Sequence, residues 1–503
     1  FPTRYLVYKD RVCIVVVLHD KITQRGSKQM NLSAYQNERM AFWNTTAKKS
    51  KTNIFNTSYH QRISEVYINL IPQESKVLEI GSGNGDLLAS LKPVVGVGID
   101  FSSQQVQIAQ NRHPELHFYC VDVDEISTTV PVQEYDFIIL SDLLNDLWDV
   151  QDTFQRIAPY CHSRTRIIIN FYSRLWQPIL SLAQLIGLAN PNLYQNWLTK
   201  EDVNNLLNLS GFESIKNWAE VLFPLPIPVL REFFNKFLVK IWPFHFLALS
   251  NFMVARPLPD AKKQDFTVSV IVPARNEAGN IENILKRTPE MGAGTEIVFV
   301  EGNSTDNTYQ TIVEKLPNFP ERRTCLLKQD GKGKGDAVRK GFSQATGDIL
   351  MILDADLTVP PEDLPRFYSA LVEGKGEFIN GVRLVYPMEK EAMRFFNFLG
   401  NKFFSLSFSY LLSQSVKDTL CGTKVLFKAD YEKIAANRSY FGDFDPFGDY
   451  DLLFGAARLG LKIIDLPIRY RERTYGSTNI QRWSHGWLLL KMVSFAAGRL
   501  KFV

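Results

Sequence analysis

Two carboxylates, Asp354 and Asp356, directly follow a short apolar run at residues 349–353. In a strand, positions i and i+2 point to the same face, so these two charges would repel each other unless a cation lay beside them. Proteins commonly hold Mg²⁺ with one or two carboxylates together with substrate phosphates. The stretch is therefore a candidate metal site, and the alternative interpretation is a solvated loop after a strand.

Other polar residues in this half of the chain also follow predicted strands. The strand at 268–272 leads into Pro273 and a polar turn, and the strand in "EIVFVEGNSTDNT" ends at Glu301, before helix-start signals. Lys332 and Lys334 lie in a Lys- and Gly-rich loop before a predicted helix. These lysines could place positive charge near the two carboxylates, or simply be solvated.

The first half of the chain carries a glycine-rich loop in "KVLEIGSGNGDLLASL". A predicted strand ends at Ile80, and Gly81, Gly83 and Gly85 follow it before a helix. Glycine lets the backbone turn sharply and approach a ligand closely, and the helix N-terminus behind it favours anionic or polar groups.

Three further predicted strands end in polar residues. Asp100 ends "VGVGID", 19 residues after Gly81, where an acid can accept hydrogen bonds from two ribose hydroxyls. Asp122 is placed for an adenine amino group, and a fourth strand ends at Ser141 and Asp142. Strands with helices between them and polar carboxyl ends indicate a doubly wound sheet.

NAD is the rival ligand for this loop, because NAD-binding domains carry an acid that binds the ribose at nearly the same distance after the first glycine. Three details oppose NAD: Glu79 precedes the first glycine by two residues, Asp86 stands where GxGxxG has its last glycine, and Asp122 offers the adenine a polar partner.

The length and composition of the chain indicate what kind of protein positions these two sets of residues. It has 503 residues, which suits two or three domains, and 45% hydrophobic with 22% charged residues is typical of an ordered globular protein. A net charge of +4 is too small to indicate nucleic-acid binding. The five cysteines form no CxxC pair, which argues against a zinc site and suits a reducing compartment.

The sequence divides at "ARPLPDAKKQDFTVSV", where prolines and charged residues separate two strand patterns. We expect one domain at 30–258, a linker at 259–265 and a second domain at 266–503. Residues 1–29 have no signal-peptide layout. We interpret Met30 as the natural start and 1–29 as a non-native upstream segment; a fragment of a longer chain is the other interpretation.

Residues 30–258 resemble the class I S-adenosylmethionine (SAM)-dependent methyltransferases, through "LEIGSGNG", "GID" and "VDVDE". The resemblance implies a Rossmann-like sheet that binds SAM. It implies that Glu79 and the loop Gly81, Ser82, Gly83 and Gly85 hold the methionine end, Asp100 and Phe101 the ribose, Asp122 and Val123 the adenine, and that Ser141 lines the floor. No catalytic base can be named, and an inactive Rossmann-like domain is the alternative.

Residues from about 266 to 490 resemble family 2 glycosyltransferases with a GT-A fold, closest to the polyprenyl-phosphate sugar synthases. "VIVPARNE", "VEGNSTDNT", "DAD", "KDTLCGTK" and "RTYGSTN" carry the resemblance. It implies a UDP- or GDP-sugar donor and Mg²⁺ or Mn²⁺ bound by Asp356 with Asp354 beside it. The implied donor-binding residues are Pro273, Ala274, Arg275, Glu277, Glu301, Lys332, Lys334, Asp354, Ala355 and Asp356. Glu301 replaces the usual Asp, which leaves uracil and guanine both open, and Thr358 replaces an amide.

The acceptor side contains Arg383 and Arg394 around an aromatic-rich segment. An arginine pair suits a phosphate, which guanidinium binds in bidentate fashion, so we expect a polyprenyl phosphate acceptor. The resemblance places Asp418, Asp449 and Asp451 on this side as catalytic candidates. A glycan hydroxyl is the alternative acceptor, with Asp449 or Asp451 as its base.

Three segments, 231–244, 395–412 and 485–502, combine apolar and basic residues and could lie in a membrane interface. We therefore expect a bifunctional enzyme of envelope or lipid-linked glycan synthesis, cytoplasmic and peripheral at the cytoplasmic membrane face, with no nucleic-acid partner. The alternatives are a glycosyltransferase with a SAM-binding regulatory domain, and a scaffold with two inactive sites.

Overall fold

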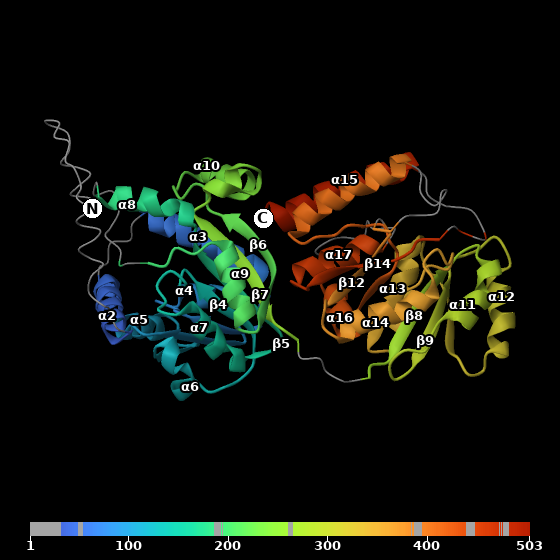
Figure 1. Ribbon diagram of the computed structural model, residues 1–503, viewed down its shortest axis with the longest axis horizontal. Coiled ribbons are helices and arrows are strands. Elements are labelled where there is room, and N and C mark those ends of the chain that lie inside the picture. The colour runs from blue at the N-terminus through green and yellow to red at the C-terminus, as the bar shows by residue number, and fades with distance from the viewer. Residues whose placement is uncertain are drawn as a thin grey trace, which may run out of the picture.

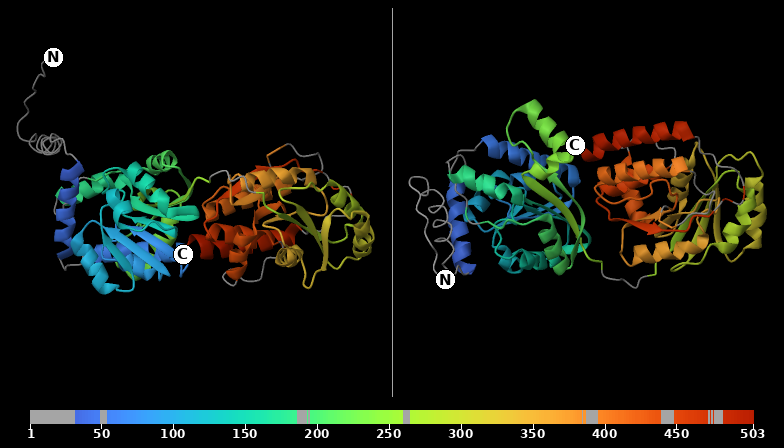
Figure 2. Two further views of the ribbon diagram at one scale, coloured as in Figure 1. Left: turned by 90° about the horizontal axis from the view of Figure 1, so that it is seen from below. Right: turned by 45° about the horizontal axis from the view of Figure 1, so that its top comes forward.

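The computed structural model describes residues 32–48, 54–185, 193, 195–259, 265–383, 385–386, 395–438, 448–471, 473, 475 and 482–503. The described residues form two α/β domains, each built around its own seven-stranded sheet. The two domains lie side by side (Figure 1), as Figure 2 shows from two other directions. The segment 1–29 lies outside the described residues.

The first sheet has the strand order β3-β2-β1-β4-β5-β7-β6. Its strands are β1 (Lys76–Ile80), β2 (Val95–Asp100), β3 (His117–Cys120), β4 (Tyr135–Ser141), β5 (Cys161–Tyr172), β6 (Phe212–Glu220) and β7 (Ser250–Pro257). β1 to β5 are parallel, and β7 runs antiparallel to both β5 and β6. The strand order reverses between β1 and β4, and open α/β sheets bind ligands at the carboxyl ends of the strands at such a point.

Helices cover both faces of this sheet. They are α2 (Leu32–Lys48), α3 (Ile54–Leu70), α4 (Asp86–Ser90), α5 (Ser103–Arg112), α6 (Ile126–Thr129), α7 (Val150–Ile157), α8 (Gln177–Leu185), α9 (Lys200–Leu209) and α10 (Pro228–Glu232). Val77 of β1 packs with α3, α4 and α5 on one face, whereas its neighbour Leu78 packs with α7 and α9 on the other. Burial of both faces explains the apolar runs of the parallel strands.

The second sheet has the order β10-β9-β8-β11-β13-β12-β14. Its strands are β8 (Val268–Ala274), β9 (Thr295–Glu301), β10 (Arg323–Lys328), β11 (Ile349–Ile352), β12 (Phe378–Val382), β13 (Lys424–Phe427) and β14 (Ile463–Pro467). β8 to β11 are parallel, and β13 is antiparallel to both β11 and β12. The expected pair of α/β folds is therefore confirmed.

The helices of the second domain also form two layers. They are α11 (Ile281–Arg287), α12 (Thr308–Lys315), α13 (Lys334–Gln344), α14 (Leu364–Val372), α15 (Phe395–Leu412), α16 (Lys428–Ala436), α17 (Asp449–Arg458) and α18 (Arg482–Ala496). α11, α12 and α14 share one apolar core with the sheet, and α13 and α15 to α18 share the other. Among the described helices, none combines the length and apolar character needed to cross a bilayer.

A buried ionic network joins the two domains. The guanidinium of Arg166 on β5 donates two hydrogen bonds to the Glu377 carboxylate, at 2.7 and 2.8 Å, and a third to the Gly460 carbonyl. Arg256 on β7 contacts Glu377 at 3.4 Å and also pairs with Glu213 of its own domain. The interface thus carries directional contacts between buried charged groups.

Glu377→Gln should weaken this interface, because two nearly buried arginines would lose a shared carboxylate. Breaking a buried ion pair by removing one partner costs about 3–5 kcal/mol. We expect a lower unfolding midpoint by calorimetry. Glu373→Gln, which removes half of the exposed pair with Lys375, is the matched control. Equal midpoints for the two variants would show that the network does not hold the domains together.

Candidate active sites

The glycine-rich loop of the first domain joins β1 to α4. Gly81, Gly83 and Gly85 have φ angles of +73°, +51° and +78°, which side chains other than glycine rarely adopt. A Cβ on Gly85 would also lie 2.5 Å from the Phe118 ring. The left-handed backbone therefore requires glycine at all three positions, and close packing adds to this at Gly81 and Gly85.

Asp100, at the end of β2, holds this loop in place. Its carboxylate accepts hydrogen bonds from the backbone N–H groups of Gly83 (2.9 Å) and Ser102 (2.8 Å). Burial raises the pKa of Asp100, and the two N–H groups oppose that rise. The residue predicted to bind a ribose thus also shapes the loop beside it.

A cavity of about 590 Å³ lies next to Asp100. Five of the ten predicted cofactor residues line it: Gly81, Asp100, Phe101, Asp122 and Val123. The other five lie in or beside β1, the loop and β4 and do not line it: Glu79, Ser82, Gly83, Gly85 and Ser141. The structure thus brings the predicted ribose and adenine residues to one cavity.

Helix α2 closes this cavity, which the sequence motifs did not indicate. Tyr35, Gln36 and Arg39 of α2 line it together with Trp148. Gln36 donates hydrogen bonds to Asp122 (3.3 Å) and Asp124, and Arg39 stacks over the Tyr35 ring at 3.6 Å. The only signal in the sequence was the aromatic content of "AYQNERMAFW", which is equally typical of a packed helix.

Buried oxygens near the loop lack partners within the protein. Glu79 Oε2, Ser82 Oγ and Asp142 Oδ2 are buried in the described structure without a hydrogen-bond partner. Burial, with Asp100 adding to it, raises the pKa of Glu79 to about 8. Such oxygens suit a ligand that brings hydroxyl groups and positive charge, as SAM does, so the residues present fit this cofactor.

Glu79 should therefore release a proton when SAM binds near neutral pH. With a pKa of about 8 the free carboxyl is largely protonated at pH 7, and a cationic ligand favours the charged form and lowers that pKa. Calorimetric titrations in phosphate and in Tris should give different binding enthalpies, and Glu79→Gln should remove the difference. Equal enthalpies for the unmodified chain would exclude this role.

In the second domain, Asp354 follows β11 and lies among three cations. Lys334, at the start of α13, contacts Asp354 Oδ1 at 2.6 Å. Burial would raise the pKa of Asp354, but Lys334, Arg383 and Lys424 together hold it below its ordinary value. A Cβ on Gly422 would lie 2.1 Å from Asp354 Oδ2, so only glycine fits beside this carboxylate.

Asp356 is bound by a residue from the far end of the domain. Arg473 Nη2 lies 2.8 Å from Asp356 Oδ2, and Arg473 Nη1 lies 3.1 Å from Glu277 Oε1. The Thr358 hydroxyl donates to Asp356 Oδ1 at 2.8 Å. Burial raises the pKa of Glu277 to about 7, with Asp356 adding to the rise and Arg473 opposing it. Arg473 begins the motif "RTYGSTN", but the sequence assigned it no contact with Asp356, which lies 117 positions away.

The remaining predicted donor residues surround these carboxylates in different ways. Pro273 and Ala274 end β8, Glu301 ends β9, and Ala355 is buried between the two aspartates. Glu301 accepts a 2.6 Å hydrogen bond from the Ser304 N–H. Arg275 and Lys332 are exposed to solvent.

The turns after these strands are strained. Asn276, Asn303 and Leu357 have φ angles of +59°, +55° and +55°. For a leucine this conformation is a genuine outlier, and residues held in such regions cluster at functional sites. The strain lies at the carboxyl ends of β8, β9 and β11, the same edge of the sheet as the two aspartates.

Arg383 and Asp418 form a buried bidentate pair. Arg383 Nε and Nη2 lie 2.7 and 2.8 Å from the two carboxylate oxygens, and Asp418 is fully buried. Asp418 also accepts from the backbone N–H groups of Arg383 and Leu420. Both carboxylate oxygens of Asp418 are thus engaged by Arg383 and by backbone N–H groups. A direct role of Asp418 at the acceptor stays a prediction, and these contacts also suit a residue that positions Arg383.

The other acceptor-side candidates are described only in part. Arg394 and the side chain of Asp449 lie outside the described residues, although Asp449 begins α17. Asp451 is nearly buried and pairs with Arg339 (3.6 Å) and Arg438 (3.5 Å). Both arginines approach the same carboxylate oxygen, Asp451 Oδ2.

The two aspartates after β11 fit a divalent cation in their donor chemistry. Both supply the hard oxygens that Mg²⁺ and Mn²⁺ prefer, at the end of a buried strand and beside cations suited to phosphate. Among the described residues, no group of three or more His, Cys, Asp or Glu side chains is arranged to hold a metal ion.

Comparison with known proteins gives a match for each domain. Residues 54–217 match the family model of a methyltransferase domain, and residues 269–434 match that of glycosyl transferase family 2. The second match contains Asp354, Asp356, Arg383 and Asp418, and it ends before Arg473.

One curated relative is the dolichol-phosphate mannosyltransferase of Pyrococcus furiosus, 29% identical over 220 residues. The match covers 42% of this chain and 59% of the relative, so the chain spans about three fifths of that protein's length.

Two solved structures are similar to one part of the chain each. One is glucosyl-3-phosphoglycerate synthase from Mycobacterium tuberculosis, at 19% identity, with 48% of this chain and 83% of that chain covered and a TM-score of 0.35. The other is magnesium protoporphyrin IX methyltransferase from Synechocystis PCC 6803, at 15% identity, with 48% and 99% covered and a TM-score of 0.30. The chain thus carries a methyltransferase domain, matched over residues 54–217, and a family 2 glycosyl transferase domain, matched over residues 269–434.

Proposed function

We propose that the chain is a bifunctional enzyme of lipid-linked or envelope glycan synthesis. Its second domain transfers a sugar from a UDP- or GDP-sugar to a polyprenyl phosphate, and its first domain transfers a methyl group from SAM. The observation that carries the proposal is the charge arrangement after β11, where Lys334, Arg383 and Lys424 act on Asp354 and Arg473 binds Asp356. Cations packed around two carboxylates suit a reaction between two phosphate-bearing substrates.

In this reaction an oxygen of the acceptor phosphate attacks the anomeric carbon of the sugar. The bond from that carbon to the nucleoside diphosphate breaks, the diphosphate leaves with the electron pair, and the anomeric configuration inverts. A lipid phosphate is ionised near neutral pH, so no side chain has to remove a proton, unlike at a hydroxyl acceptor. The engaged carboxylates of Asp418 and Asp451 are consistent with a site that needs no base.

Each charged residue then has a part in the transfer. Lys334 offsets charge on the departing diphosphate, and Nη1 of Arg383 orients the acceptor phosphate while Asp418 holds the rest of the guanidinium. Asp356, with Asp354, would hold Mg²⁺ or Mn²⁺, and the bound metal would supply Lewis-acid stabilisation of the diphosphate. The named relative, a dolichol-phosphate mannosyltransferase, supports a lipid phosphate acceptor.

Exposed apolar side chains support the proposal of a peripheral membrane contact at the cytoplasmic face. α8, α10 and α15 lie along one side of the molecule (Figure 1). These helices, the segment after α10 and α18 all expose apolar side chains: Leu182, Val229, Phe237, Trp242, Leu406 and Trp487. Trp242 is 74% exposed. Exposed apolar surface of this kind marks interaction sites. Trp242→Ser should reduce co-sedimentation with lipid vesicles, and unchanged co-sedimentation would exclude this surface.

For the first domain, Asp100→Ala should weaken SAM binding at least several-fold. The variant removes acceptors for ribose hydroxyls, a loss of about 1–3 kcal/mol, and frees the Gly83 N–H that orders the loop. Asp100→Asn retains one acceptor oxygen, so its affinity for SAM should lie between that of the unmodified chain and that of Asp100→Ala. Unchanged affinity of Asp100→Ala by calorimetry would show that the cavity beside Asp100 is not the SAM site.

The decisive test of the sugar transfer incubates the full chain with Mn²⁺, labelled UDP- or GDP-sugars and polyprenyl phosphate, followed by extraction of the lipid phase. Label in the organic phase is expected for one class of donor. Label only in a soluble glycan would instead support the hydroxyl acceptor. SAM binding without methyl transfer to any lipid-linked sugar would instead support a regulatory role for the first domain.

A further inference from the structure

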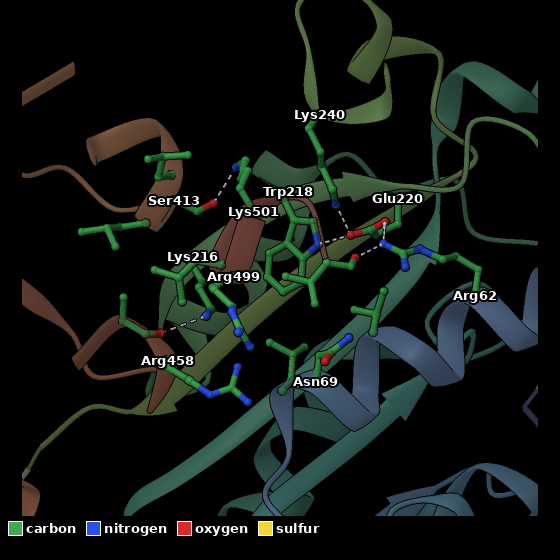
Figure 3. A pocket seen from close by; sticks show the side chains of 17 residues that line it. Arg62, Asn69, Lys216, Trp218, Glu220, Lys240, Ser413, Arg458, Arg499 and Lys501 are labelled. Carbon is green, nitrogen blue, oxygen red and sulfur yellow. Dashed lines mark hydrogen bonds and ion pairs between the residues drawn. The ribbon is translucent and has the colours of Figure 1, made fainter. Parts of the chain in front are cut away.

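A second large cavity lies between the two domains, away from both sites described above. It has a volume of about 720 Å³, part of it open to solvent, and shares no lining residue with the cavity beside Asp100. The first domain contributes the last turns of α3, three residues of β6 and Lys240. The second contributes the ends of α15 and α17 and residues 499–501 and 503. Figure 3 shows these side chains converging on the cavity.

The lining of this cavity is strongly basic. Its side chains comprise one carboxylate, Glu220, and six Lys and Arg residues: Arg62, Lys216, Lys240, Arg458, Arg499 and Lys501. Glu220 is already engaged, because Arg62 (3.2 Å), Lys240 and the Trp218 indole N–H (2.8 Å) all contact its oxygens. Arg62 is engaged further by the Glu65 carboxylate (3.2 Å) and the Val503 carbonyl (2.8 Å), so the excess of positive charge rests on the lysines of the cavity.

Two lysines show the imbalance most directly. Lys216 Nζ donates to the Ala457 carbonyl at 3.4 Å, and Lys501 Nζ donates to the Ser413 hydroxyl at 2.8 Å. Neither has a carboxylate within ion-pair distance among the described residues, although an ammonium group offers three donors. Burial, together with the charges of Arg166 and Arg458, lowers the pKa of Lys216 to about 8. Burial and Lys240 likewise lower that of Lys501 to about 8, with Lys216 adding to the shift.

Like charges gathered in a partly buried cavity repel one another more strongly than in water. An anion between them would relieve this repulsion and satisfy the remaining donors. Phosphate suits the mixture best, since guanidinium groups bind its oxygens in bidentate fashion and lysine ammonium groups act as compact point charges. A group with two negative charges also matches several cations better than a single carboxylate does.

We propose that this cavity binds a phosphoryl-bearing anion, held by Lys216 from the first domain and by Arg458, Arg499 and Lys501 from the second. The bound group bridges the two domains, so its binding favours the side-by-side arrangement seen here. Its source is either a soluble phosphate compound or the headgroup of an anionic lipid. The lipid source is reasonable because exposed Phe237 stacks on Phe502 near the cavity, at 4.6 Å between ring centroids.

The test compares the full chain with the double variant Lys216→Met/Arg499→Met, using inorganic phosphate as the probe and sodium chloride at equal ionic strength as the blank. The matched control is Lys286→Met/Lys375→Met, which removes two positive charges from exposed ion pairs elsewhere. Phosphate should raise the melting temperature of the unmodified chain and of the control by at least about 2 °C. It should not raise that of the cavity variant.

Two further readouts make the result specific. In phosphate-free buffer the cavity variant should melt close to the unmodified chain, because relief of charge repulsion offsets the loss of the 3.4 Å hydrogen bond of Lys216 and of the contact between Arg499 and the Phe495 ring. A clear drop would show that the cations are structural and would overturn the proposal. An equal phosphate response in the cavity and control variants would overturn it as well.

The source of the phosphoryl group is found with phosphatidylcholine vesicles that either contain or lack phosphatidic acid. Flotation with the acidic vesicles alone, lost in the cavity variant but retained in the control, identifies a lipid headgroup. A phosphate-induced rise in melting temperature without such flotation identifies a soluble phosphate compound. Neither outcome depends on sugar or methyl transfer, so failure of the proposed enzyme activities leaves this test intact.

Discussion

Asp356→Ala should reduce sugar transfer by about 10³-fold or more while leaving SAM binding unchanged. The variant removes the carboxylate expected to hold the divalent cation, and loss of one group that stabilises developing charge commonly costs about 10²–10³-fold. It also breaks the contact of Arg473 with Asp356, whereas the contact of Arg473 with Glu277 remains. The measurement is transfer of labelled sugar to the lipid phase at saturating donor.

Asp356→Asn separates charge from shape in the same experiment. The amide keeps the size of the side chain and an acceptor for the Thr358 hydroxyl, but it cannot offset the charge of a cation. Its transfer rate should be nearly as low as that of Asp356→Ala. Asp363→Asn, which alters a carboxylate near Arg366 at the surface, is the control. Normal transfer by Asp356→Ala in the presence of a chelator would show that the reaction does not need the metal.

Arg383→Lys should reduce transfer to polyprenyl phosphate by about 10²-fold without changing the affinity for the sugar nucleotide. Lysine keeps the positive charge beside Asp418, but it cannot make two parallel hydrogen bonds and still present a further donor. The acceptor phosphate would then lose its orientation rather than its attraction, and misplacement of a reacting group by about 1 Å can cost 10²-fold. Arg383→Ala is less informative, because it would leave the Asp418 carboxylate buried without a partner.

The matched control for Arg383→Lys is Arg287→Lys. Arg287 also makes a bidentate pair, with Glu362 at 2.7 and 2.9 Å, but on the surface. It should transfer sugar normally. Asp418→Asn tests the positioning role: it should lower kcat for the lipid acceptor while the KM for the donor stays constant. If Arg383→Lys and Arg287→Lys transfer sugar at the same rate, Arg383 does not contact the acceptor.

The amino-acid sequence by itself determined the features that depend on the local backbone. Glycines at 81, 83 and 85 are required by left-handed φ angles in one loop, and polar residues follow the carboxyl ends of the parallel strands. Alternation of apolar residues, turn signals and the spacing of Asp354 and Asp356 all act over a few residues. For this reason the two α/β folds and the cavity beside Asp100 could be predicted.

The tertiary structure alone decided which distant side chains meet. Arg473 reaches Asp356 across 117 positions, Asp418 is paired with Arg383, and helix α2 closes the cavity beside Asp100. The basic cavity between the domains brings Lys216 close to Arg458 and Lys501. Such pairings depend on strand order, on the packing of helices over the sheets and on the docking of one domain against the other. No local pattern of residues encodes them, because each partner by itself looks like an ordinary charged or aromatic side chain.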